Sequence, residues 1–261
     1  MKEKYLRIFF TLLVIGLVLL EFALVSSAID NVSNKLICWG FKREKDNKQP
    51  SLDKSSLAIL EKYNGFAIGN PDKPIIYLSF DLGYEAGYTS QILDVLKENN
   101  VQASFFITAH YLNTQEELVR RMIKEGHIVG NHTVNHKDLV KLSDEEIKRE
   151  ITDLSNSIYD KFGYEVTFFR PPKGEYSERI IKIASELNYT TVLWSSAYDD
   201  WDENKQGREE YGKSKILDNL HNGCILLLHG TSKDNANILD SVIKETINKG
   251  YEFKNLEEFE L

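Results

Sequence analysis

Four polar residues of this sequence have side chains that suit the hydrolysis of an amide or ester. Asp81 and His229 each close an apolar run, and two further histidines, His132 and His136, stand four residues apart. A carboxylate, a pair of imidazoles and a separate histidine are the groups that a metal-assisted hydrolase needs. The pattern therefore predicts a hydrolytic site assembled from distant parts of the chain.

Hydrolysis of an acetamide needs a nucleophilic water, a base, positive charge near the oxyanion and an acid for the leaving amine. Asp81 is the candidate base, because partial burial at a strand end would raise its pKa towards a useful value. It could instead cap the turn that leads into the next helix. His229 is the candidate acid, since a carboxylate partner such as Asp200 would raise its pKa. A hydrogen-bonded core histidine is the alternative.

The two histidines four residues apart are candidate metal ligands. On a helical turn this spacing places both imidazoles on one face, at a separation suited to one divalent cation. Two hydrogen-bonded loop histidines are the alternative. The preceding Gly130-Asn131 break and the aspartate at a neighbouring strand end favour the ligand role for His132 and His136.

The segment Arg-Pro-Pro-Lys-Gly at residues 170–174 supplies further candidates. We expect Arg170 to pair with Asp81, to fix its rotamer and to moderate its basicity. The two prolines stiffen the loop, so that the N–H near Lys173 could be aimed at the oxyanion. Three aromatic residues could form an apolar wall for the acetyl methyl or a sugar face: Tyr84, Trp194 and Trp201. Each could equally belong to the core, and for Trp194 the core is the favoured interpretation.

The elements that must position these residues are indicated by an alternation of short β-rich runs and longer helix-period segments from residue 73 onward. We expect strands at residues 75–80, 103–107, 128–129, 166–169, 190–194 and 225–228, with a last strand near Phe253. We expect helices at residues 89–98, 114–124, 143–162, 177–187, 213–220 and 235–249. Ser143 and Glu146 form a capping-box pattern at the start of the longest helix.

This repetition of strand and helix predicts an α/β fold with a parallel sheet. About seven strand–helix units in one domain close more naturally as a distorted (β/α)7-type barrel than as an open sheet. The active site of such a barrel lies at the carboxyl ends of its strands. The topology alone therefore brings Asp81, His132, Arg170 and His229 towards one pocket.

Composition limits the class of protein and its partners. The 261 residues are 42% hydrophobic and carry a net charge of −8, which supports one large core. The acidic balance argues against a nucleic-acid partner, because phosphate backbones are bound by basic stripes. The two cysteines, Cys38 and Cys224, match no metal-ligand spacing and indicate no disulfide framework.

The N-terminus resembles an export segment. Basic residues precede an apolar run that starts at Ile8, and small residues up to Ala28 offer a cleavage site. An uncleaved membrane anchor is equally well supported, since the apolar stretch approaches the ~20 residues that a bilayer needs. Both interpretations place the rest of the chain outside the cytoplasm. We assign residues 1–28 to the signal peptide or anchor, 29–72 to an N-terminal extension and 73–261 to the main domain. The extension either packs on the main domain or forms a solvated linker.

Five ordered segments resemble the motifs of the polysaccharide deacetylases, also called carbohydrate esterase family 4 or the NodB homology domain. They are Ser-Phe-Asp at 79–81, His-Thr-Val-Asn-His at 132–136, Arg-Pro-Pro-Lys-Gly at 170–174, Asp-Trp at 200–201 and Leu-Leu-Leu-His at 226–229. Residues 79–89, 170–177 and 39–50 look like the branch of delta-lactam-biosynthetic de-N-acetylases of spore-forming bacteria.

The resemblance implies an exported hydrolase with the NodB homology fold that removes N-acetyl groups from the N-acetylmuramic acid of peptidoglycan glycan strands. Such an enzyme contributes to muramic delta-lactam formation in the spore cortex, and lactam closure in the same site would need mainly orientation. We expect it to act as a monomer. The alternatives are a deacetylase of another N- or O-acetylated polysaccharide, chitin-like or xylan-like, and a catalytically idle glycan-binding protein.

One position departs from the family pattern. Many relatives have an aspartate directly after the base as the third metal ligand, where this chain has Leu82. The lactam-forming branch also tends to lack that aspartate. The resemblance therefore implies a divalent metal, with zinc as one candidate, held by His132 and His136. Without the aspartate, the site would bind the metal weakly, complete its shell with water or substrate, or use a further ligand outside these motifs.

Overall fold

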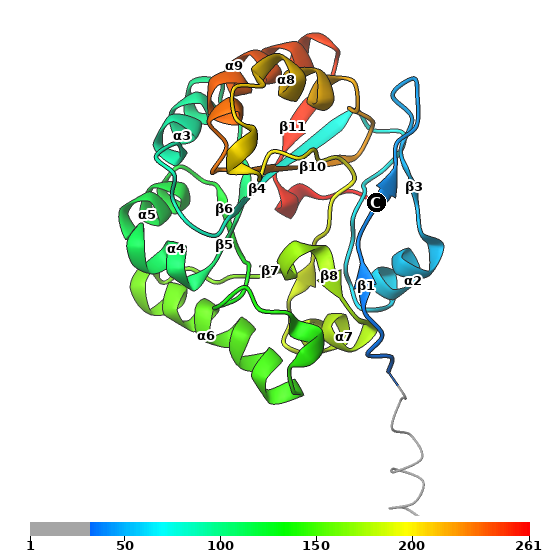
Figure 1. The fold of residues 1–261 in the computed structure, drawn as a ribbon, viewed down its shortest axis with the longest axis vertical. Coiled ribbons are helices and arrows are strands. Elements are labelled where there is room, and N and C mark those ends of the chain that lie inside the picture. Colours follow the sequence, from blue (N-terminus) through cyan, green and yellow to red (C-terminus); the bar gives the residue numbers. More distant parts are fainter. Residues whose placement is uncertain (1–31) are drawn as a thin grey trace, which may run out of the picture. The chain divides into compact units, whose positions relative to one another are not determined.

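The structure, a computed structural model, describes residues 32–261 (Figure 1). The signal peptide or anchor predicted at residues 1–28 lies outside the described residues. Within residues 32–261, no helix has both the length and the apolar character needed to cross a membrane. Residues Asn34–Leu261 form one compact unit, so the extension from residue 34 onward packs with the main domain.

A curled sheet with parallel pairing forms the centre of this unit. Its strand order is β10-β4-β5-β6-β7-β9, and β11 pairs with the first half of β4. The strands are β4 (Ile75–Leu82), β5 (Ser104–Ile107), β6 (Ile128–Asn131), β7 (Phe168–Phe169), β9 (Thr190–Thr191), β10 (Cys224–His229) and β11 (Glu252–Lys254). β4 is buried along its whole length, as expected of a strand covered on both faces.

The sheet curls back on itself, which agrees with the predicted distorted barrel. After β9 the chain returns to β10 through a parallel bridge between Ser196 and Leu226. The N–H of Leu227 donates to the carbonyl of Ser196 at 2.9 Å. The strand predicted at 190–194 is shorter than expected, because beyond Thr191 the N–H of Leu193 donates to the carbonyl of Phe66 instead.

Helices surround the sheet on its outer side (Figure 1). They are α3 (Thr89–Glu98), α4 (Ala109–Thr114), α5 (Glu116–Lys124), α6 (Asp144–Phe162), α7 (Glu178–Glu186), α8 (Glu209–Leu217) and α9 (Lys233–Asn248). Single 3-10 turns lie at Leu139–Lys141, Pro172–Gly174, Glu203–Lys205 and Leu256–Glu258. The capping box predicted at Ser143 is present, and α6 ends at Gly163 with φ of 62°.

The helix predicted at residues 213–220 lies earlier in the chain than expected. α8 begins four residues earlier, at Glu209. The carboxylate of Asp234 accepts the N–H groups of Gly207 and Arg208, each at 2.8 Å, and so satisfies donors at the start of the helix. This partner lies 26 residues further along the chain from Arg208, and local sequence does not reveal it.

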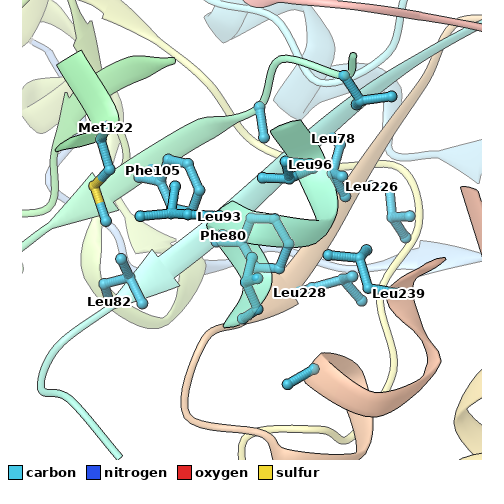
Figure 2. Packing of buried hydrophobic residues seen from close by; sticks show 14 of the residues in the cluster. Leu78, Phe80, Leu82, Leu93, Leu96, Phe105, Met122, Leu226, Leu228 and Leu239 are labelled. Atoms are coloured by element: carbon cyan, nitrogen blue, oxygen red, sulfur yellow. The ribbon is translucent and has the colours of Figure 1, made fainter. Parts of the chain in front are cut away.

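The alternation of side chains along β4 separates the core from the site. Leu78, Phe80 and Leu82 lie in the large apolar cluster beneath the helices (Figure 2). Ser79 and Asp81, at the positions between them, both contact Arg170. Successive residues of a strand point to opposite faces. Leu82 therefore points into the helix layer, whereas Asp81 points into the barrel.

The N-terminal extension packs on the barrel and is not a solvated linker. β1 (Ile37–Cys38) pairs antiparallel with β8 (Glu175–Tyr176), while β2 (Phe41–Lys42) pairs with β3 (Ser51–Leu52). The helix α2 (Lys54–Lys62) follows. Both cysteine thiols are free: Cys38 is exposed and Cys224 is buried.

Candidate active site

A cavity of about 510 Å³ opens at the carboxyl ends of the central strands. Its lining residues are Asp81, His132, Lys173, Trp194, Trp201, Leu227 and His229. Asp81 and His229 are register partners on the neighbouring strands β4 and β10. The predicted base, the predicted acid and one predicted metal ligand therefore share one cavity, as the topological argument required.

Arg170 lies fully buried beneath this cavity and holds Asp81 in place. Its Nη1 donates to Asp81 Oδ1 at 2.8 Å and its Nη2 to Ser79 Oγ at 3.0 Å. Its Nε donates to the Val192 carbonyl at 3.1 Å, and its guanidinium carbon lies 4.0 Å from the centroid of the Phe106 ring. The pairing predicted between Arg170 and Asp81 is confirmed.

The net direction of the Asp81 pKa differs from the one expected from burial, whereas the moderating effect expected of Arg170 is present. Burial does raise the pKa of this carboxyl, but nearby positive charges, with Arg170 the strongest, outweigh burial and lower it. A charged partner within hydrogen-bond distance favours the ionised form. Asp81 is therefore a carboxylate at neutral pH and can accept a proton there.

His132 is oriented by a backbone carbonyl. Its Nδ1 lies 2.8 Å from the Arg170 carbonyl oxygen, which can only accept, so Nδ1 carries the hydrogen. Nε2 then presents its lone pair 3.6 Å from Asp81 Oδ2. Burial lowers the pKa of His132, so the ring is neutral. Two acceptor atoms face each other across this gap, an arrangement that fits a cation or a bound water.

His136 lies beside His132, although not on the helical turn that the spacing predicted. The two ring centroids are 4.9 Å apart. The backbone has φ of 70° at Thr133 and 53° at His136, values incompatible with a right-handed turn. The Thr133 hydroxyl accepts the His136 N–H at 2.9 Å. Burial lowers the pKa of His136 to about 4, so this imidazole too is neutral and available as a ligand.

A buried glutamate that the sequence interpretation missed supports this loop. Glu150 of α6 accepts the backbone N–H of Asn135 at 2.8 Å and its side-chain amide at 2.7 Å. Lys137 Nζ lies 3.3 Å from the same carboxylate. One signal was available: Glu150 lies on the helix face that also carries the buried residues Ile147 and Ile151.

The donor set fits a divalent ion only in part. Residues 32–261 contain no group of three histidine, cysteine or acidic residues arranged to hold a metal ion. Leu82 cannot help, because its side chain lies in the helix layer. The neutral imidazoles of His132 and His136 fit two ligand positions, and the remaining positions of a catalytic site would be taken by water or substrate.

Asp200 fixes the orientation of His229 through two contacts. Its Oδ1 lies 2.8 Å from His229 Nδ1, and its Oδ2 accepts the His229 backbone N–H at 2.7 Å. Asn235, a partner that the sequence did not reveal, donates its side-chain amide to the same Oδ2 at 2.6 Å. Burial lowers the pKa of His229, but the charge of Asp200 and its hydrogen bond outweigh burial and raise it. The predicted pairing is therefore present and favours an imidazolium.

Of the remaining candidates for contact with substrate, three line the cavity and one does not. Lys173 and Trp201 line the cavity, and Trp201 is 61% exposed. Trp194 both lines the cavity and packs on the core, so the favoured core interpretation and the alternative of an apolar wall both hold. Tyr84 is 38% exposed and is not among the lining residues; its substrate role stays a prediction. Leu227 was missed because it resembles any other residue of an apolar strand.

Known proteins resemble this chain over most of its length. A family model described as polysaccharide deacetylase matches residues 68–192. The peptidoglycan-N-acetylmuramic acid deacetylase PdaA of Bacillus subtilis is 40% identical over 228 residues, 87% of each chain. An uncharacterized 30.6 kDa protein of Geobacillus stearothermophilus is 45% identical over 242 residues, 92% of this chain and 91% of the other. The solved structure of PdaA, titled a family 4 carbohydrate esterase, has a TM-score of 0.85 and covers 87% of this chain and 98% of that chain.

Proposed function

Since the chain belongs to the polysaccharide deacetylase family, carbohydrate esterase family 4, we propose that it removes N-acetyl groups from N-acetylmuramic acid in peptidoglycan. The relatives that match most of the chain include named peptidoglycan deacetylases, which makes it a carbohydrate de-N-acetylase. The observation that carries the proposal is the placement of Asp81 and His229 at paired strand ends in one cavity. Each has its own charged partner, Arg170 and Asp200 respectively.

The reaction divides between these two residues. Asp81 takes a proton from a water molecule while the oxygen of that water attacks the acetamide carbonyl carbon. A tetrahedral intermediate forms. The C–N bond then breaks, and His229 gives a proton to the departing nitrogen. The products are a free amine and acetic acid, which loses its proton to solvent and becomes acetate. The cycle closes when Asp81 releases its proton and His229 takes one up again.

Deacetylases of this family are generally metal-dependent, and we propose His132 and His136 as the ligands here. A bound divalent ion, zinc being one candidate, would polarise the acetamide oxygen and lower the pKa of the nucleophilic water. With two imidazoles in place of three protein ligands, we expect weak binding. Glu150 and the Arg170 carbonyl would orient the two rings.

Lys173 supports muramic acid as the substrate. Muramic acid differs from glucosamine by a lactyl group that ends in a carboxylate, and Lys173 brings an ammonium group to the cavity lining. Trp201 and Trp194 offer apolar faces for a sugar ring or the acetyl methyl. Tyr84 remains a further candidate for contact with the glycan.

The cellular setting is part of the same proposal. Peptidoglycan lies outside the cytoplasm, and residues 1–28 have the sequence of a signal peptide or anchor. Residues 73–261 would form the deacetylase domain and residues 29–72 its extension. We propose a role in sporulation, in which the freed amine and the lactyl carboxyl close to the delta-lactam. We propose that the protein acts as a monomer.

Acetate release tests this function. Wild type, Asp81→Asn and His136→Ala are compared on muramyl glycan strands, with and without chelator, and the products are analysed by mass spectrometry. Wild type should remove acetyl groups, Asp81→Asn should lose this activity, and His136→Ala should resemble chelated wild type. Asp160→Asn, at an exposed position of α6, is the matched control.

The same assay separates the alternatives. Acetate release from N-acetylglucosamine oligomers or xylan-like polymers alone would assign another polysaccharide. Binding of glycan strands with no acetate release in the presence of added metal would support an idle binding protein. Unchanged activity in Asp81→Asn would contradict the proposed mechanism.

A further inference from the structure

The N-terminal extension reaches the wall of the catalytic cavity through Trp39. We propose that Trp39 is a positioning residue, which holds the turn that carries Lys173 against the segment that carries Trp194. The effect that we expect on KM rests on the proposed function. The effect that we expect on amide hydrogen exchange does not depend on any activity.

The turn beside the cavity has a backbone that needs external support. Lys173 has φ of 59° and ψ of 5°, and Gly174 follows with φ of 67°. A lysine in the left-handed region costs free energy and persists only where the surroundings hold it. A Cβ added at Gly174 would lie 2.7 Å from Trp194 Cη2 and 3.1 Å from Trp39 Cβ. The turn is therefore enclosed between two tryptophans, and only glycine fits there.

Trp39 joins the two sides of this enclosure with two hydrogen bonds. Its backbone N–H donates to the Gly174 carbonyl at 2.8 Å, which continues the pairing of β1 with β8. Its indole Nε1 donates to the Trp194 carbonyl at 2.8 Å. One residue of the extension thus connects two segments that both line the cavity.

A second contact of the extension reaches the same region. Arg43 Nη2 donates to the Ala197 carbonyl at 2.7 Å, in the segment that leads from Trp194 to Asp200 and Trp201. This contact is exposed and is therefore weaker in its effect than the half-buried bond of the Trp39 indole. The extension therefore contacts the segment that joins the lining residues Trp194 and Trp201 at a second point.

The groups that transfer protons do not depend on these contacts. Asp81 is held by Arg170 inside the barrel, and His229 is held by Asp200. Loss of the Trp39 indole bond should therefore loosen Lys173 and Trp194, which contact substrate in the proposed function, without changing either proton-transfer pair. We expect a higher KM with an unchanged pH profile.

The test compares Trp39→Phe with Leu36→Ala. Trp39→Phe keeps an aromatic ring but loses the Nε1–H donor, and Leu36, in the same extension, is 45% exposed. Each variant is checked for folding by thermal unfolding and then assayed on muramyl glycan. We expect Trp39→Phe to raise KM by up to about fivefold, because the free energy of one neutral hydrogen bond limits what positioning through this bond can add to substrate binding, with the pH profile of wild type. Leu36→Ala should behave as wild type.

Hydrogen exchange gives the readout that does not need activity. In Trp39→Phe, the amides of Lys173, Gly174 and Ser195 should exchange faster than in Leu36→Ala. If folded Trp39→Phe has the KM and the exchange rates of wild type, the proposal is overturned. It is also overturned if kcat alone falls, in proportion to the amount of folded protein lost. If wild type releases no acetate, the proposed function fails, and the exchange rates still decide the role of Trp39.

Discussion

The substitution Leu82→Asp would recreate the aspartate pair of relatives that have a third metal ligand, and we expect it to unfold the protein without completing a metal site. Leu82 is fully buried among the apolar side chains shown in Figure 2, and strand alternation places it on the face of β4 opposite Asp81. It belongs to the apolar cluster that contains Phe105 and Met122. A Cβ added at Gly230 would overlap Leu82 Cδ2, so the leucine fills its space closely.

The size of the loss follows from this environment. Removing a fully buried leucine side chain forfeits about 2–3 kcal/mol of burial free energy. An unpaired carboxylate in its place adds a penalty of several kcal/mol. The sum, about 5 kcal/mol or more, is comparable with the whole free energy of unfolding of a typical domain, ~5–15 kcal/mol.

Urea unfolding followed by circular dichroism measures this loss, and calorimetric titration with zinc measures metal affinity. Leu82→Asn, with a similar shape and no charge, should be less destabilised than Leu82→Asp. Leu82→Met should lose under about 1.5 kcal/mol. A Leu82→Asp protein that unfolds at the urea concentration of wild type and binds zinc more tightly would show that residue 82 faces the cavity, and would refute the argument from strand alternation.

Three further perturbations follow from the same geometry. Asp200→Asn removes the charge that raises the pKa of His229; because a general acid works only below its pKa, the alkaline limb of the pH–rate profile should move to lower pH. Arg170→Met leaves Asp81 buried without its partner, which should cost about 3–5 kcal/mol in urea unfolding at neutral pH. The pKa of Asp81 is lowered in the folded state, so the stability that the pair contributes is lost as pH falls, and wild type and Arg170→Met should converge in acid. Glu150→Gln should weaken zinc binding about tenfold in calorimetry by loosening the histidine loop, whereas the same change at an exposed glutamate of α6 should not.

Much of the fold and part of the site followed from local patterns in the sequence. The apolar run of β4 and the capping box of α6 appear where they were predicted, because strand burial and helix capping depend on neighbours along the chain. Parallel topology then required Asp81 and His229, each at the end of such a run, to meet at one edge of the sheet.

Long-range contacts decided the rest. The histidine loop takes its shape from a strained backbone and from Glu150, which lies 15 residues beyond Asn135, so the helical spacing of its histidines was misleading. Trp39 reaches the cavity by pairing across 155 residues with Trp194.

The sequence by itself determined which groups could do chemistry and at which strand ends they stand, because residue type and alternation are local properties. Only the tertiary structure decided their protonation and orientation. The pKa of Asp81 falls although burial alone would raise it, since Arg170, 89 residues away in the chain, lies 2.8 Å from its carboxylate. Charge–charge interactions depend on distance in space, and that distance is set only when the chain folds.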